Sequence, residues 1–188
     1  MQDFVTLYDK HESAQVRAQR QQRLVSQYSL PLITLNNYVP QHMVHTTAAK
    51  KLFQISLNAV QEELNKLQCR VVKSVELNQK TGDELLLVVV GASSSELKRA
   101  MIKLEKHHML GALMNVDVMT DEGKMISRQA CEMEPRKCVI CDNAASYCTT
   151  IRNHSAEQLG TKLQLMLETY QDEMKAAVTE VELEEAVA

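Results

Sequence analysis

The stretch that decides the fold is Glu84-Leu85-Leu86-Leu87-Val88-Val89-Val90-Gly91, a continuous aliphatic run between an acidic residue and a glycine. A strand with one face in water alternates polar and apolar side chains, but this run is apolar at every position, so both of its faces must be covered. Its valines are β-branched, which favours an extended backbone. The sequence therefore predicts a central strand over 84–90, closed by Gly91.

The residues on either side of this run predict its neighbours. The aliphatic segment 71–77 is separated from it by 79–83, a turn in which Gly82 can take a positive φ, and this pattern indicates a hairpin. Downstream, 93–96 is Ser-Ser-Ser-Glu, the form of a capping box in which a serine hydroxyl and a glutamate carboxylate bond the first free N–H groups of a helix. We therefore expect a hairpin and then a helix ending near His107.

The other elements are predicted from apolar periodicity and from cap and turn signals. In chain order they are a helix over 12–26, an extended segment over 30–39, a helix capped by Thr46 or Thr47, a strand over 113–119, a second hairpin arm over 124–128 and a helix over 156–178. The segment 132–154 shows little periodicity. Helices interleaved with hairpins favour an α+β fold with a mixed or antiparallel sheet and flanking helices, in one domain over 1–178 with an acidic C-terminal tail over 179–188.

The composition limits the class of protein. The chain has 188 residues, 45% of them hydrophobic, and a net charge of -3, so no broad positive field would collect nucleic acid. No apolar run approaches the ~18 residues of a membrane span, and the first residues lack the pattern of a signal peptide. We expect a cytoplasmic protein with no nucleic-acid or membrane partner, whose 5 cysteines are thiols or metal ligands rather than disulfides.

Two oxygen-bearing side chains fall together on the strand predicted over 113–119. Asn115 and Asp117 are two residues apart, so they share one face, close to the glycine of Leu110-Gly111-Ala112. Magnesium prefers such oxygen ligands and commonly combines one or two carboxylates with substrate phosphates. Taken alone, however, an Asn-x-Asp on a strand is more often an ordinary polar surface, so both interpretations stay open.

Several basic residues lie at positions where they could bind a phosphate group. Arg128 and Arg136 fall near the end of the predicted second hairpin, where they either bind phosphate through their guanidinium groups or are ordinary hydrated loop residues. Arg17 and Arg20 are three residues apart on a predicted helix and so share a face, which is either a phosphate clamp or a solvated stripe.

A group of soft donors occupies the segment without periodicity. Cys138, Cys141, Cys148 and His154 follow one another with gaps of two, six and five residues. Three thiols and one imidazole make a closed zinc site of the structural kind, but the spacing matches no standard finger. A structural Zn²⁺ site and a set of simply reduced cysteines are therefore both compatible with the sequence.

Taken together, these residues resemble one known family. The resemblance rests on a specific central block and on looser upstream matches, and it covers nearly the whole chain. The block comprises His108-x-Leu110-Gly111-x-Leu113-x3-Asp117-Val118, Gly123, Ile126-Ser127-Arg128, Pro135-Arg136-Lys137-Cys138-x2-Cys141, Ala145, Cys148 and His154, and the upstream matches are Arg17-x2-Arg20-Gln21, Pro31-Leu32 and Lys50-x-Leu52-Phe53. The order resembles that of the apo-citrate lyase phosphoribosyl-dephospho-CoA transferase (holo-citrate lyase synthase) family.

The resemblance implies a nucleotidyltransferase-like fold and a specific reaction. The phosphoribosyl-dephospho-CoA unit would pass from triphosphoribosyl-dephospho-CoA to a serine of the citrate lyase acyl carrier protein, releasing pyrophosphate. The implied roles are catalysis by Asp117, Asn115 and Arg128, with Mg²⁺ on the first two, and substrate binding by Gly111, Arg136, Arg17 and Arg20.

The chain departs from the family pattern at two positions in the central block. The family has Gly-Arg-Leu and Asp-x-Asp where this chain has Gly111-Ala112-Leu113 and Asn115-x-Asp117, so one cation and one anion are replaced. An alternative function is therefore that of a catalytically weakened homologue that binds the carrier protein or the nucleotide without efficient transfer.

Overall fold

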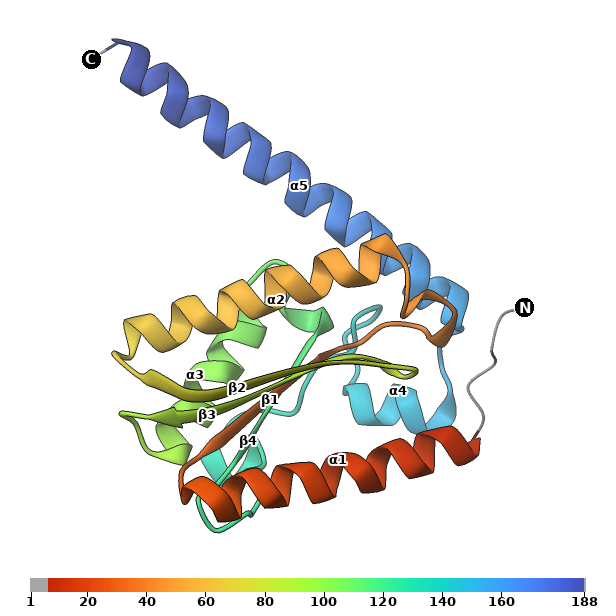
Figure 1. Cartoon of the computed structure of the whole chain (residues 1–188). Coiled ribbons are helices and arrows are strands. Elements are labelled where there is room, and N and C mark those ends of the chain that lie inside the picture. The colour runs from red at the N-terminus through yellow and green to blue at the C-terminus, as the bar shows by residue number, and fades with distance from the viewer. Residues whose placement is uncertain (1–6, 188) are drawn as a thin grey trace.

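The computed structural model describes the backbone of residues 7–187 and the side chains of residues 14–177 and 179. Its centre is a four-stranded sheet in the order β2-β3-β1-β4, in which every neighbouring pair is antiparallel (Figure 1). The strands are β1 (Leu32–Asn37), β2 (Arg70–Gln79), β3 (Gly82–Val90) and β4 (Met114–Met119). The aliphatic run is thus an inner strand, β3, as its composition predicted. The α+β class is confirmed, with an antiparallel sheet.

Helices cover both faces of the sheet. On one face, α2 (Thr47–Lys66) and α3 (Ser94–His107) bury alternate β3 residues such as Leu85, Leu87 and Val89. On the other face, α1 (Leu7–Tyr28) covers Leu86 and Val88, so that both sides of the run are removed from water (Figure 1). The last helix, α5 (Ala156–Val187), packs its first half on α2.

The local signals of the sequence are confirmed in detail. Gly82 lies in the turn between β2 and β3 with φ of 115°. Ser93 and Glu96 form both halves of the capping box at the start of α3, and the Thr46 hydroxyl caps α2. Each of these signals depends only on a few residues that are neighbours in the sequence. The turn and the two helix caps could therefore be predicted without knowledge of the tertiary structure.

Three expectations are corrected. Residues 124–128 form no second strand, because only one isolated bridge, Met119 to Met125, and the Ile126 N–H bond to the Val118 carbonyl join them to β4. The segment without periodicity contains a short helix, α4 (Ala145–Ile151), whose seven residues are too few to show a period. Helix α5 continues past its predicted end at residue 178 to Val187, while the division into a domain over 1–178 and an acidic tail over 179–188 stays a prediction. Glu, a good helix former, is the commonest residue there, and this favours the extension.

The outer edge of β4 is protected by charged side chains rather than by another strand. The Val116 N–H donates to Glu105 Oε1 at 2.8 Å, and Lys98 Nζ donates to the Val116 carbonyl at 3.0 Å. Both charged residues belong to α3 and are buried. Since an open edge exposes unpaired backbone groups, these two bonds satisfy both backbone groups of Val116 and fix α3 against β4.

Within residues 7–187, no helix combines the length and the apolar character that crossing a bilayer requires.

The capping box gives a test of the start of α3. Replacing Ser93 by Ala removes the hydroxyl that accepts the Glu96 N–H, and we expect a loss of about 1 kcal/mol in the free energy of unfolding. Urea unfolding followed by circular dichroism measures it. The control is Ser95→Ala, an exposed serine of the first turn. Equal stability of the two variants would contradict a stabilising cap.

Candidate functional site

A polar patch interrupts the sheet face that α1 covers. Sheet register pairs Thr34 with Asp117 and Asn36 with Asn115, so these four side chains lie side by side on β1 and β4. Glu84 adjoins Asn36, because the pair of Leu35 with Leu85 separates them by one step on each strand. We call these five residues the polar patch. The predicted proximity of Asn115 and Asp117 on one face is confirmed.

The two oxygen-bearing residues of β4 are held by hydrogen bonds to their neighbours. Asn115 Nδ2 donates to Asn36 Oδ1 at 2.9 Å and, more weakly, to Asp117 Oδ2 at 3.4 Å. Lys98 Nζ donates to Asp117 Oδ1 at 3.1 Å. The side chain of Lys98 is only 4% exposed, whereas that of Asp117 is 39% exposed. Asp117 can therefore meet a ligand from solvent while a buried ammonium group fixes its orientation.

Glu105 brings the two predicted phosphate-binding arginines together. Its carboxylate, buried on α3, is in contact with the guanidinium groups of Arg128 and Arg136, the latter at 3.2 Å from Oε1. Arg136 also donates to Asn115 Oδ1 at 3.4 Å and lies 4.7 Å from the centre of the Tyr38 ring. Arg136 thereby links the buried carboxylate to the polar patch.

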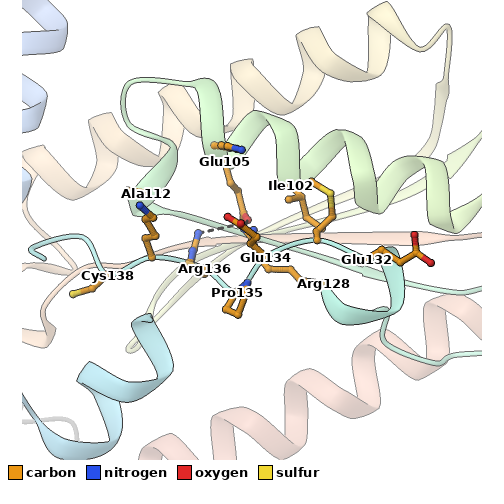
Figure 2. Close-up of a pocket in the computed structure, with 12 residues that line it drawn as sticks. Ile102, Glu105, Ala112, Arg128, Glu132, Glu134, Pro135, Arg136 and Cys138 are labelled. Carbon is orange, nitrogen blue, oxygen red and sulfur yellow. Dashed lines mark hydrogen bonds and ion pairs between the residues drawn. The ribbon is translucent and has the colours of Figure 1, made fainter. Parts of the chain in front are cut away.

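A cavity of about 330 Å³ opens beside these arginines. Glu105 extends from α3 toward Arg136, and Arg128, Ala112 and Cys138 also line the cavity (Figure 2). The lining carries four cations, Lys106, Arg128, Arg136 and Lys137, against the three carboxylates Glu105, Glu132 and Glu134, so a small positive surplus favours an anion.

Arg17 and Arg20 meet a buried carboxylate. Arg17 Nε lies 2.9 Å from Glu84 Oε1, as an ion pair without hydrogen-bond alignment, and Arg20 Nη1 donates to Glu84 Oε2 at 3.3 Å. The side chain of Glu84 is 2% exposed. Burial raises the pKa of the Glu84 carboxyl above its usual value, although both guanidinium groups act to lower it. A freely solvated stripe is thus excluded for these arginines.

Gly111 takes a different place from the other predicted site residues. It lies in a short 3₁₀ helix, η2 (Gly111–Leu113), and is buried. A Cβ atom at this position would lie 2.3 Å from the Glu105 carbonyl oxygen, so only glycine permits η2 to approach the end of α3. The packing explains Gly111 without a ligand, and its role in substrate binding stays a prediction. Its neighbour Ala112 lines the cavity instead.

The four soft donors converge, although they are spread over 17 residues. Their ligand atoms all lie within 4.8 Å of one another, and the cluster could hold a metal ion. The distance is 3.5 Å between Cys141 Sγ and Cys148 Sγ, and 3.3 Å between Cys141 Sγ and His154 Nε2. Burial, with the adjacent thiols of Cys141 and Cys138, raises the pKa of Cys148 to about 11. Burial also acts to raise the pKa of Cys138, but N–H donors and neighbouring thiols outweigh it and the pKa falls below its usual value.

Around the polar patch and the first cavity, positive charge exceeds negative charge. Seven cations face five carboxylates there, although the chain as a whole carries a net charge of -3. The cations are Arg17, Arg20, Lys98, Lys106, Arg128, Arg136 and Lys137, and the carboxylates are Glu84, Glu105, Asp117, Glu132 and Glu134. The surplus provides local binding of a polyanion that the overall charge would repel.

Lys98 and Glu105 were missed in the sequence, and so were Asn36 and Glu84. A signal for the first two exists, because they fall seven residues apart on the apolar stripe of α3, where charged residues are rare. No comparable signal marks Asn36, whose role follows from the pairing of β1 with β4.

The raised pKa of Glu84 gives a pH-dependent prediction. A carboxyl whose pKa is higher in the folded state binds its proton more tightly there, so its contribution to stability falls as pH rises above the ordinary glutamate pKa. Glu84→Gln removes this titration. We therefore expect the stability of the variant relative to the parent to increase from about pH 4.5 upward, measured by thermal unfolding across pH. A relative stability that decreases with pH would show that the two arginines outweigh burial.

Comparison with known proteins shows the family of this chain. The family model described as "Apo-citrate lyase phosphoribosyl-dephospho-CoA transferase" matches residues 9–170. A "Probable apo-citrate lyase phosphoribosyl-dephospho-CoA transferase" of Vibrio cholerae serotype O1 (strain M66-2) is 35% identical over 156 residues, which cover 83% of this chain and 88% of that protein. An "Apo-citrate lyase phosphoribosyl-dephospho-CoA transferase" of Escherichia coli O1:K1 / APEC is 26% identical over 151 residues, which cover 80% of this chain and 82% of that protein. This chain belongs to the apo-citrate lyase phosphoribosyl-dephospho-CoA transferase family.

Proposed function

We propose that this chain transfers the phosphoribosyl-dephospho-CoA group from triphosphoribosyl-dephospho-CoA to a serine of the citrate lyase acyl carrier protein. The serine oxygen forms a bond to the phosphorus nearest the ribose, the bond from that phosphorus to the leaving oxygen breaks, and pyrophosphate departs while the serine proton passes to a base. The family match over residues 9–170 supports this transfer and disfavours the alternative of binding alone.

The observation that carries the proposal is the pairing of Arg128 and Arg136 on the single carboxylate of Glu105 beside a cavity. Phosphoryl transfer depends mainly on positioning and on stabilising charge, which preformed guanidinium groups provide. Because Glu105 is fixed by the Val116 N–H, the arginines approach the donor from a rigid base. We assign them to the phosphates of the donor.

Asp117 and Asn115 are the proposed magnesium ligands. The fit to magnesium rests on one partly exposed carboxylate, whose Oδ2 has only a long contact with Asn115 Nδ2. The Asn115 amide oxygen faces Arg136 and would turn toward the ion to ligate it. Such a sparse set is in keeping with an ion that also takes substrate phosphates. When bound, the ion would neutralise charge on the departing pyrophosphate. The pair on an antiparallel strand is also the reason to propose a nucleotidyltransferase-like fold.

Arg17 and Arg20 would bind the donor from the other side of the polar patch. A separate cavity of about 220 Å³ is lined by Arg17, Asn36 and Gly82 among others. Glu84 neutralises part of the positive charge there and holds both arginines over the sheet. Substrate binding by these two residues is implied by the family resemblance and supported by this position.

The proposal includes a protein acceptor, a cellular compartment and a second metal. The acceptor is the acyl carrier subunit that the family name implies. None of the five cysteines forms a disulfide, as the reducing cytoplasm favours. We assign the metal of the Cys–His cluster as structural zinc, since three thiols and an imidazole form a closed zinc site.

The intact mass of the apo carrier protein tests the reaction. After incubation with this protein, magnesium and triphosphoribosyl-dephospho-CoA, we expect a mass gain equal to the phosphoribosyl-dephospho-CoA unit. We expect Asp117→Asn to lower the initial rate on the order of a hundredfold, because the proposed magnesium ligand loses its charge. The control is Asp121→Asn, the same change in an exposed turn. Failure of the parent protein to modify the carrier beside an active relative would reject the function.

A second variant tests the position at which this chain departs from its family. Asn115→Asp adds a carboxylate beside Asp117, so we expect the magnesium concentration that gives half the maximal rate to fall several-fold. Asn58→Asp, at an exposed position of α2, is the matched control. An unchanged magnesium dependence in Asn115→Asp would place the ion away from residue 115.

A further inference from the structure

The segment that carries Arg136 has almost no hydrophobic core. Of residues 132–158, only Cys148 is buried, and Tyr147 and Ile151 are 55% and 50% exposed. Helix α4 has seven residues and no side-chain cap at its start, so it is too short to be stable by itself. Packing therefore provides little of the energy that orders this segment.

Two of the six ligand-atom distances in the cluster are close to those of a tetrahedral zinc centre, and all six are within 4.8 Å. Zinc-to-sulfur and zinc-to-nitrogen bonds of standard length put ligand atoms roughly 3.5 to 3.8 Å apart. The separations of 3.5 Å between Cys141 and Cys148 and 3.3 Å between Cys141 and His154 are close to these values. Four protein donors leave no open position, which is typical of a structural rather than a catalytic ion.

Donors around the cluster support thiolate ligands. The Ile140 N–H points to Cys138 Sγ at 3.5 Å, and Asn153 Nδ2 lies 3.7 Å from Cys148 Sγ. Such contacts orient metal-bound sulfur atoms and stabilise their charge. The cluster is thus supported by its own segment of chain.

A short backbone ladder connects the cluster to Arg136. The Cys138 N–H donates to the Asn143 carbonyl and the Ala145 N–H donates to the Arg136 carbonyl, each at 2.8 Å. Arg136 is therefore two residues from one ligand and bonded to the first residue of the helix that carries another, Cys148. An ion that closes the cluster would hold both ends of this ladder.

The same segment separates two cavities. Arg136, Lys137 and Cys138 line both the cavity of about 330 Å³ and a larger one of about 520 Å³. The larger cavity also includes Cys148, Arg152 and His154, so the cluster and its surroundings form one of its walls. Movement of this segment would change both cavities together.

We propose that a zinc ion bound by Cys138, Cys141, Cys148 and His154 folds residues 135–156 and thereby positions Arg136 for polyphosphate binding. Without the ion, the contact of Arg136 with Glu105 must order a segment that has almost no core of its own, at a cost in conformational entropy. Zinc then acts as a positioning element and takes no part in the transfer. The identity of the polyphosphate as the donor rests on the proposed function, but the effect of zinc on Arg136 does not.

The test compares the parent protein with Cys141→Ser and with Cys69→Ser, the same change at a cysteine outside the cluster. We expect one zinc per chain by elemental analysis in the parent and in Cys69→Ser, and none in Cys141→Ser. Calorimetry with inorganic tripolyphosphate should show affinity reduced at least about tenfold in Cys141→Ser, because a charge-assisted arginine contact is lost. Hydrogen exchange should increase over 135–156 and stay unchanged in β3.

Chelator treatment of the parent followed by added zinc gives the same comparison if Cys141→Ser does not fold. Absence of zinc from the parent would overturn the proposal. So would zinc removal that leaves tripolyphosphate affinity and exchange over 135–156 unchanged. A parent that binds tripolyphosphate in a zinc-dependent manner but does not modify the carrier would instead reject the proposed function and retain this inference.

Discussion

The carboxylate of Glu105 is the group on which the candidate site depends. It accepts the Val116 N–H at the open edge of β4 and pairs with both Arg128 and Arg136. A buried carboxylate is costly unless each of its oxygens has partners, and here one backbone donor and two guanidinium groups supply them. The bond that closes the edge of the sheet therefore also sets the distance between the sheet and the proposed phosphate-binding arginines. Lys98 completes this arrangement by joining the Val116 carbonyl to Asp117.

The two faces of the sheet differ in the polarity of their buried side chains. The side of α2 and α3 holds the larger apolar core, with buried polar groups at Ser56 and at the β4 edge, where Lys98 and Glu105 lie. The side of α1 is apolar only over part of its length, around Leu86 and Val88, and becomes polar where Glu84 and Asn36 begin. Buried charges are tolerated at that end because Arg17 and Arg20 accompany Glu84. The charged site therefore lies on the α1 face of a sheet whose stability comes mainly from the core under α2 and α3.

The region between β4 and α5 is built on another principle. From residue 132 to residue 158 the chain buries a single residue, yet this segment carries Arg136 into the site and lines two cavities. Elements with so few apolar contacts are expected to open most easily. A cluster of four metal-binding side chains lies in this segment, where a cross-link would constrain the chain most effectively.

The sequence by itself determined the features that depend on near neighbours. The aliphatic run 84–90 required an inner strand, Gly82 required a turn, Ser93 with Glu96 required a helix start, and residues two apart on a strand put Asn115 and Asp117 on one face. Tertiary structure alone decided which distant groups meet these residues. The pairing of β1 with β4 brought Asn36 to Asn115, and the packing of α3 on the edge of β4 gave Lys98 and Glu105 their partners. The physical reason is that an ion pair or a hydrogen bond between residues far apart in the chain has no local energetic signature, so it exists only once the fold has brought its two groups together.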